Sequence, residues 1–332
     1  MKGKNLNVEV LRGVLMIWIV LFHYTTRFNE LFNCRPCSYE FEWGGQVGVT
    51  FFFILSGYFF YAGLLKMQNQ SLLGITKFCA NKYWRLYPAY LIAIIIIFAV
   101  YQFACLPGRE CSIRDFIVNS VFIYHPGFYY VDSAHWFLAT LIKMQIISAF
   151  FLAFKSSIRT YLILSFELVV IGLLVCSNVF TPSIFTKIES VFSLDCFLKF
   201  LIGYNIFEIL SSNSSRTIRY IHIFLALLAM GYYCYTINLV LVLLYSVVLF
   251  LVLQNKHIPF LNCSKPFVII GKYSFVWYLI HQNIGFIILN QINKWGINSE
   301  LGIVIPMLIT FGLAVMIQSI VNLLPRKIFS IS

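Results

Sequence analysis

The sequence predicts an all-α membrane protein, a polytopic bundle of about ten transmembrane helices with both termini in the cytoplasm. Composition, hydropathy and charge placement lead to this fold class. Of the 332 residues, 60% are hydrophobic and only 11% are charged, whereas soluble domains carry about 25% charged residues. The mean hydropathy is +0.84. Because so few polar groups cannot cover a water-facing surface, a soluble enzyme, a disordered chain and a nucleic-acid-binding module are excluded.

Apolar runs that can cross about 30 Å of hydrocarbon give the helix positions. We predict spans near residues 9–26, 46–65, 86–105, 134–153, 160–177, 193–210, 219–236, 238–254, 274–291 and 301–323. Pro88 is expected to end the loop before the third span and to begin that helix. With neither an internal repeat nor a long linker, residues 1–332 are expected to form a single integral-membrane domain without an appended soluble domain.

Charge placement gives the expected orientation. If the N-terminus is cytoplasmic, most of the 24 Lys and Arg residues fall in inner segments and most acidic residues in outer ones. The positive-inside rule then places both termini in the cytoplasm. The net charge of +12 is thus a topology signal that needs no nucleic-acid partner. The first apolar run lacks a small-residue cleavage site, so we expect it to remain as an anchor.

Four of the nine cysteines fall on the predicted outer side, namely Cys34, Cys37, Cys105 and Cys111. An oxidising compartment would allow them three pairings, and the sequence leaves open whether a structural disulfide forms. The CRPC run has no second CxxC to complete a zinc site, so no metal is predicted.

Arg12 and His23 are the polar residues of the first span that point to chemistry. Eleven residues of α-helix correspond to about 16 Å of rise and about 20° beyond three full turns, so both side chains share one stripe. Ionisable groups in a span usually face a protein interior or a wet cavity. The alternative is a topogenic arginine and a histidine satisfied at the outer end of the helix.

The run LRGVLMIWIVLFHY, preceded by Glu9, resembles the opening signature of acyltransferase family 3. Its members are integral-membrane O-acyltransferases that modify bacterial O-antigens, capsules, peptidoglycan and other glycans. Four further stretches resemble family segments in the expected order: GGQVGVTFFFILSGYFF, KYWRLYPAY, HWFLATLI and GKYSFVWYLIHQ. The sequence departs from the family at Thr50 and Leu141, where acids are common, and at Lys82, where an arginine is expected.

The resemblance implies an acyl-CoA donor, which we expect to be acetyl-CoA. Acyl-CoA is made in the cytoplasm and carries several phosphate charges, so its site needs cations that face inward. Arg12, Lys82 and Arg85 lie at the predicted inner edge, and guanidinium groups donate paired hydrogen bonds to phosphates. We therefore predict that these three residues bind the donor. The alternative is that they are ordinary positive-inside anchors.

Transfer to a sugar hydroxyl requires a base, and a histidine suits this task. We predict His23 as the catalytic residue, acting either on the sugar directly or as the carrier of the acyl group. Glu9 is the candidate for an assisting acid. Trp136, His281 and Ser56 are candidates for acceptor binding. The alternative for Trp136 is anchoring at the membrane interface. For His281 it is a hydrogen bond to a neighbouring helix, and for Ser56 it is helix packing.

The leading hypothesis is an inner-membrane O-acetyltransferase that modifies a lipid-linked or growing surface glycan, such as an O-antigen or capsule repeat unit. Membrane lipids would surround it. The alternatives are a transporter or exporter lined by Arg12 and His23, and a family member with a longer acyl donor or a small-molecule acceptor. Further intramembrane charges are expected to form ion pairs with one another: Lys143, Glu167, Asp195, Lys199 and Glu208.

Overall fold

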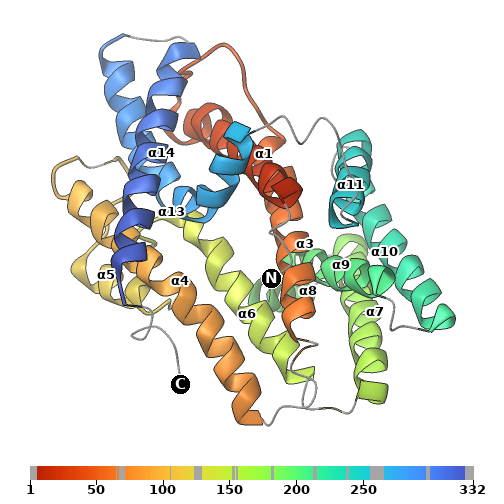
Figure 1. Cartoon of the computed structure of the whole chain (residues 1–332). Coiled ribbons are helices and arrows are strands. Elements are labelled where there is room, and N and C mark those ends of the chain that lie inside the picture. Colours follow the sequence, from red (N-terminus) through yellow and green to blue (C-terminus); the bar gives the residue numbers. More distant parts are fainter. Residues whose placement is uncertain are drawn as a thin grey trace. The chain divides into compact units, whose positions relative to one another are not determined.

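The computed structural model of the chain describes residues 6–64, 66, 72–104, 106–122, 129–151, 154, 156–180, 183–211, 215–236, 239–254, 265–296 and 300–325. These residues are helical apart from short connections, and no strand occurs among them (Figure 1). The elements in chain order are α1 (Leu6–Phe22), the π-helical η1 (His23–Arg27), α2 (Phe28–Phe32), α3 (Gly44–Leu64), α4 (Leu72–Tyr101), α5 (Ile113–Ser120), the 3₁₀-helical η3 (Ser133–His135), α6 (Trp136–Phe150), α7 (Ser156–Phe180), α8 (Ser183–Phe192), α9 (Leu194–Leu210), α10 (Arg216–Thr236), α11 (Leu239–Leu253), α13 (Lys265–Lys294) and α14 (Glu300–Leu323).

The predicted all-α membrane class is confirmed. Each of the ten predicted spans overlaps a helix among the described residues. Among the described residues, five helical stretches are long and apolar enough to cross a membrane: Leu6–Phe32, Gly44–Leu64, Leu73–Tyr101, Ile158–Ser177 and Gly302–Leu323. A total of ten spans and the cytoplasmic location of both termini stay predictions.

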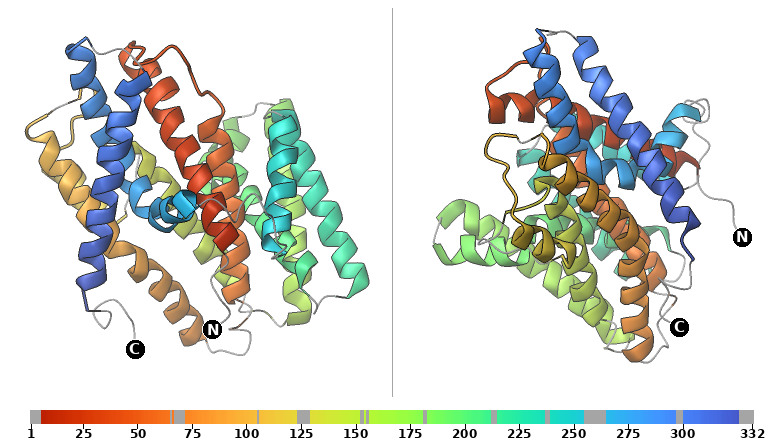
Figure 2. Two further views of the ribbon diagram at one scale, coloured as in Figure 1. Left: turned by 45° about the horizontal axis from the view of Figure 1, so that its top comes forward. Right: turned by 90° about the vertical axis from the view of Figure 1, so that its left-hand side faces the viewer.

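The chain divides into two compact units. The first contains Met1–Gly48, Asn81–Ala139 and His257–Ser332, and the second contains Val49–Ala80 and Thr140–Lys256. In the first unit α13 packs against both α1 and α14, and in the second unit α10 packs against α9 and α11 (Figure 2). Residues distant in sequence are thus brought together within the first unit, where α1 and α13 lie side by side.

Small residues set the contact between α1 and α13. A Cβ atom added to Gly271 would overlap the backbone carbonyl of Glu9, and one added to Gly13 would overlap a backbone carbonyl of α13. Such close approach between helices is typical of glycine in membrane proteins. Further along the same pair of helices, Tyr24 Oη donates a 2.7 Å hydrogen bond to the carbonyl oxygen of His281. Together these contacts fix the register of α1 against α13.

The predicted helix start at Pro88 is wrong. Helix α4 begins at Leu72 and continues through Pro88, which lies in its interior. A proline removes one backbone hydrogen bond, yet membrane helices tolerate it where neighbouring groups satisfy the freed carbonyl. Lys82 and Arg85 therefore lie on a helix and not in a loop, three residues apart and so on one face.

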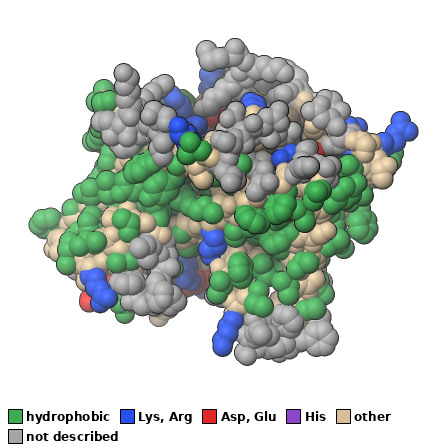
Figure 3. Space-filling view, turned by 90° about the horizontal axis from the view of Figure 1, so that it is seen from below, with side chains coloured by type: hydrophobic (Ala, Val, Ile, Leu, Met, Phe, Trp, Pro, Cys, Tyr) green, Lys and Arg blue, Asp and Glu red, His purple; other side chains and the backbone are tan. Residues whose placement is uncertain are grey.

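Large apolar side chains are exposed on several helices, and Figure 3 shows that they cover much of the face seen there. Examples on α4, α7, α10 and α14 are Ile95, Tyr161, Leu168, Phe224, Leu227, Leu308 and Met316. Contiguous apolar surface of this kind marks contact with a membrane or with another protein. Together with the long apolar helices, it agrees with a chain that has lipid as its surroundings.

Two of the five charges that the sequence places in spans form an ion pair. Lys199 Nζ lies 2.6 Å from Asp195 Oδ2 in α9. Glu167 instead accepts a 2.7 Å hydrogen bond from Asn205 Nδ2, and Lys143 Nζ donates to a backbone carbonyl oxygen. The expected pairing is thus found for Lys199 and Asp195, whereas Glu167 and Lys143 contact an amide and a backbone group.

Three of the four cysteines on the predicted outer side, Cys34, Cys37 and Cys111, form no disulfide. Cys34 and Cys111 have free thiols. Cys37 donates its thiol hydrogen to the carbonyl oxygen of Tyr39, and Cys105 lies outside the described residues. The disulfide that the sequence leaves open therefore does not involve Cys34, Cys37 or Cys111.

Candidate functional site

His23 lies where the first helix changes its geometry. It is the first residue of η1, in which the α-helix widens to a π-helix. Side chains at this junction form hydrogen bonds with backbone carbonyl oxygens of the preceding turn. His23 Nδ1 lies 2.8 Å from the Ile19 oxygen, and Thr25 Oγ1 donates a 2.7 Å bond to Leu21. Short π-helical turns frequently occur at functional sites, and this one ties the imidazole to its own helix.

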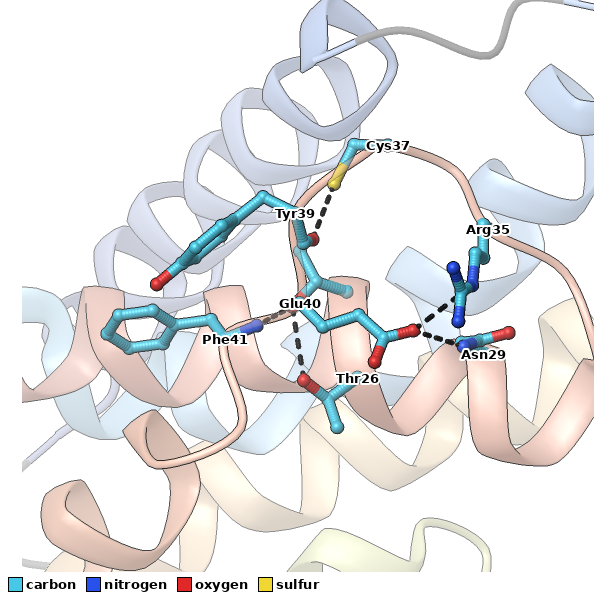
Figure 4. Close-up of polar contacts among 8 residues, drawn as sticks. Thr26, Asn29, Arg35, Cys37, Tyr39, Glu40 and Phe41 are labelled. Atoms are coloured by element: carbon cyan, nitrogen blue, oxygen red, sulfur yellow. Dashed lines mark hydrogen bonds and ion pairs between the residues drawn. The ribbon is translucent and has the colours of Figure 1, made fainter. Parts of the chain in front are cut away.

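The loop after α2 folds back onto η1 and holds it (Figure 4). The carboxylate of Glu40 accepts a hydrogen bond from Asn29 Nδ2 and pairs with Arg35 Nε at 3.4 Å. The backbone N–H of Phe41 donates to Thr25 Oγ1 at 3.0 Å. The widened turn is therefore supported both by its own helix and by the loop that follows it.

A second histidine contacts His23 from α13. His281 Nδ1 lies 2.7 Å from the Tyr278 carbonyl oxygen, and its Nε2 lies 3.3 Å from His23 Nδ1. A carbonyl oxygen can only accept, so in the neutral pair each Nδ1 carries the hydrogen. The one hydrogen on His23 Nδ1 is then shared between the Ile19 oxygen at 2.8 Å and His281 Nε2 at 3.3 Å, and the lone pair of His23 is on Nε2.

The two histidines differ in burial. His281 is completely buried, whereas the side chain of His23 is half-buried. The rings meet edge to face, with centroids 4.8 Å apart. This arrangement makes His281 a residue that orients the imidazole of His23. The structure thus brings together two residues that the sequence assigned to different tasks, catalysis and acceptor binding.

A buried polar network adjoins the pair on α13. Asp132 accepts hydrogen bonds from the backbone N–H groups of Ala134 and Asn283 at 2.9 and 3.1 Å. Asn283 Oδ1 in turn accepts a 2.7 Å bond from Arg109 Nη1. Burial raises the pKa of Asp132 above its ordinary value, and electrostatic interactions with His135 and Arg109 act in the opposite direction. The network fixes the segment before α6 against α13.

In the first half of α1, Arg12 interacts with a carboxylate of its own helix and with a cation of α4. Arg12 Nη1 lies 3.4 Å from Glu9 Oε2, and Arg85 on α4 is close enough to Arg12 to interact with it electrostatically. The Arg12 side chain is 31% exposed and Arg85 is exposed. Two partly accessible cations that repel each other are suited to an anion, because a phosphate offsets their mutual repulsion.

The remaining predicted residues lie as follows. Glu9 is buried and pairs with Arg12, about 21 Å along the helix from His23, so the structure places it with Arg12 and not with His23. Lys82 is half-buried on the same face of α4 as Arg85. Trp136 begins α6 and is 40% exposed. Ser56 belongs to the second compact unit.

Helix packing explains the surroundings of Ser56. A Cβ atom added to the adjacent Gly57 would overlap the carbonyl of Phe200, and one added to Gly203 would overlap that of Ile54. The backbones of α3 and α9 therefore touch at this point. The observation favours the packing interpretation of Ser56 over acceptor binding.

Sequence reasoning missed Arg109, Asp132 and Asn283 as parts of the site. Asn283 follows His281 and Gln282, three consecutive polar residues in the middle of a long apolar helix, and this run was the available signal. Arg109 and Asp132 lie in irregular segments, where no periodicity relates a residue to its neighbours in space.

A family model described as an acyltransferase domain matches residues 5–321, nearly the whole chain. The chain belongs to the acyltransferase 3 family. The family assignment confirms the resemblance and, with the apolar helices, makes the protein a multi-pass membrane acyltransferase. Comparison of this acyltransferase with curated proteins and with solved structures gives no match.

Proposed function

We propose that the acyltransferase is an O-acetyltransferase of the inner membrane, which moves the acetyl group of acetyl-CoA to a sugar hydroxyl of a surface glycan. The observation that carries this proposal is the state of His23. Its Nδ1 is engaged with Ile19 and His281, so the lone pair of Nε2 is available on a half-buried ring. A base held in one tautomer and one orientation is what proton transfer from an alcohol requires.

In the proposed reaction, Nε2 takes the hydroxyl proton as the sugar oxygen attacks the carbonyl carbon of the thioester. The C–S bond then breaks, and the proton passes from the imidazolium to the departing sulfur. The products are the O-acetylated sugar and the free thiol of CoA. An acyl-histidine route would use the same nitrogen as the nucleophile, so both forms of the mechanism depend on Nε2.

The cations at the other end of α1 support the choice of donor. Arg12 lies about 16 Å along the helix from His23, and the extended pantetheine arm of CoA can cover such a separation. Phosphates bound by Arg12 and Arg85, with Lys82 beside them, would leave the thioester to reach His23. The ammonium group of Lys82 is a point charge and lacks the planar pair of N–H donors of a guanidinium group. We therefore assign Lys82 a weaker contribution to phosphate binding than the arginines.

Replacing Arg85 with glutamine is expected to weaken CoA binding by about tenfold, because a charge-assisted hydrogen bond to phosphate is lost. The dissociation constant of CoA for detergent-solubilised protein measures this. Arg216→Gln is the matched control, since Arg216 is an exposed cation of the second unit and should leave the constant unchanged. Equal binding by wild type and Arg85→Gln would remove Arg85 from the donor site.

The proposed activity is tested with purified protein, [acetyl-¹⁴C]acetyl-CoA and membranes that contain the cell's own glycans. We expect label to enter the polysaccharide fraction in an alkali-labile ester, with equimolar release of CoA thiol. Release of thiol without labelled glycan would contradict the glycan acceptor. A carrier protein would consume no acetyl-CoA at all, and that result would overturn the proposal.

A further inference from the structure

Arg109 is a cation that the proposed mechanism does not use, although it lies beside the His23–His281 pair. Its Nη1 donates to Asn283 Oδ1 at 2.7 Å and to Ser133 Oγ at 2.9 Å. Its Cζ lies 5.4 Å from the centroid of the Phe286 ring. Contacts from α13 and from the segment before α6 therefore hold the guanidinium in a defined place, unlike a freely moving surface arginine.

Asp132 interacts electrostatically with Arg109, but no hydrogen bond in the described part of the chain joins the two side chains. Both hydrogen bonds go to neutral oxygen atoms, and the nearby carboxylate of Asp132 accepts from the backbone N–H groups of Ala134 and Asn283. Within the described part of the chain, both bonds of the guanidinium come from Nη1. The fork formed by Nε and Nη2 is thus available to an anion, and Arg109 is half-buried with part of its side chain accessible.

The ring of Phe286 lies near both Arg109 and His23. The centroid of its ring lies 6.4 Å from that of His23, so one ring adjoins both the imidazole and the guanidinium. The charge of Arg109 also acts electrostatically on His23. An anion bound at Arg109 would therefore lie next to the reacting centre. The donor phosphates have their own cations at Arg12 and Arg85, about 16 Å along α1 from His23.

We propose that Arg109 binds an anionic group of the acceptor, so that the acyltransferase selects an acidic acceptor. The proposal rests on the proposed function, because it concerns the second substrate of that reaction. The chemistry is that of a carboxylate or phosphate facing a planar fork of N–H donors. Two sources would provide it: the carboxylate of an acidic sugar, or the diphosphate that joins a glycan to a lipid carrier.

Two matched pairs of probes distinguish the sources. The first pair is methyl glucuronide and methyl glucoside, which differ in the carboxylate alone. The second pair is a polyprenyl diphosphate and the corresponding polyprenol. We expect wild-type protein in detergent to bind the anionic member of one pair about tenfold more tightly than its neutral member. Arg109→Gln is expected to lose that preference, and Arg109→Lys to keep part of it.

Arg27→Gln is the matched control for the loss of a cation. Arg27 also acts electrostatically on His23, but it is exposed and its Nη1 lies 2.6 Å from Glu30 Oε2. The preference for the anionic probe should survive in this variant. Arg109→Lys keeps a positive charge that can still reach Asn283, so it serves as the second test if Arg109→Gln fails to fold by gel filtration.

Preference in the first pair would identify an acidic sugar, and preference in the second would identify the lipid carrier. The inference is overturned if wild type prefers neither anion, or if the Arg109 variants bind the preferred anion as tightly as wild type. Acetyl-CoA turnover, measured separately, distinguishes the two proposals. Turnover without an anion preference refutes the acidic acceptor alone, whereas absence of turnover refutes the proposed function.

Discussion

Substituting His23 with asparagine is expected to lower acetyl transfer by about 10²-fold to 10⁴-fold, which is the usual contribution of a general base. The asparagine amide can still donate to the Ile19 carbonyl in place of Nδ1, but it has no equivalent of the Nε2 lone pair. The variant thus separates the loss of proton transfer from the loss of the hydrogen bond that ties His23 to its helix. Release of CoA thiol by purified protein measures the effect.

His222→Asn is the matched control for this experiment. His222 is also a buried histidine, but it lies in the second compact unit, where its Nδ1 is 2.8 Å from Asn205 Oδ1. The amide nitrogen of the substituted asparagine can replace that contact, so transfer should persist. A wild-type rate in His23→Asn, with the protein folded, would exclude His23 from the mechanism as base and as nucleophile.

Gly271→Val is expected to have the largest effect on stability. A Cβ atom at this position would overlap the backbone carbonyl of Glu9, and a backbone atom cannot rotate away as a side chain can. Overpacking typically costs about 1–3 kcal/mol and sometimes more, and separating α1 from α13 would also remove His281 from His23. We therefore expect a lower midpoint of thermal unfolding in detergent, together with the loss of transfer.

Gly312→Ala on α14 provides the comparison, because no atom lies within 4 Å of its added Cβ. Alanine in a helix is favoured over glycine by about 0.5–1 kcal/mol, so this variant should unfold at the same temperature or slightly higher. An unchanged midpoint for Gly271→Val would show that α1 and α13 can separate without cost, contrary to the structure.

The approximate positions of the long helices could be predicted from the sequence, because the hydropathy of a segment depends only on which residues it contains. The apolar runs lie on α-helices since a buried backbone in lipid must satisfy its own hydrogen bonds. Two features of the helices were outside the reach of such reasoning. Helix α4 continues through Pro88, and the predicted span at 9–26 gives no sign of the π-turn that begins at His23. Both concern hydrogen-bond register, to which hydropathy is insensitive.

The sequence could predict which site residues share a face of one helix, but not which residues of different helices come into contact. Helical geometry related Arg12 to His23, because α1 is regular up to Phe22. The contact of His23 with His281 depends on the register of α1 against α13, and that register comes from backbone contacts at two glycines. Arg109 reaches the site through a connection without regular structure. Its place therefore depends on tertiary contacts that no local pattern contains.

At the π-helical turn, we expect activity to depend on the number of residues as well as on their side chains. Each residue of an α-helix adds about 100° of rotation. Deleting one residue from His23–Arg27 would let the turn close to α-helical geometry and would change the backbone hydrogen-bond register that holds His23 and Thr25, whereas inserting one more residue would rotate α2 and the loop through Glu40 by about 100°. Functional variants of the acyltransferase should therefore accept substitutions between His23 and Asn33 more readily than insertions or deletions.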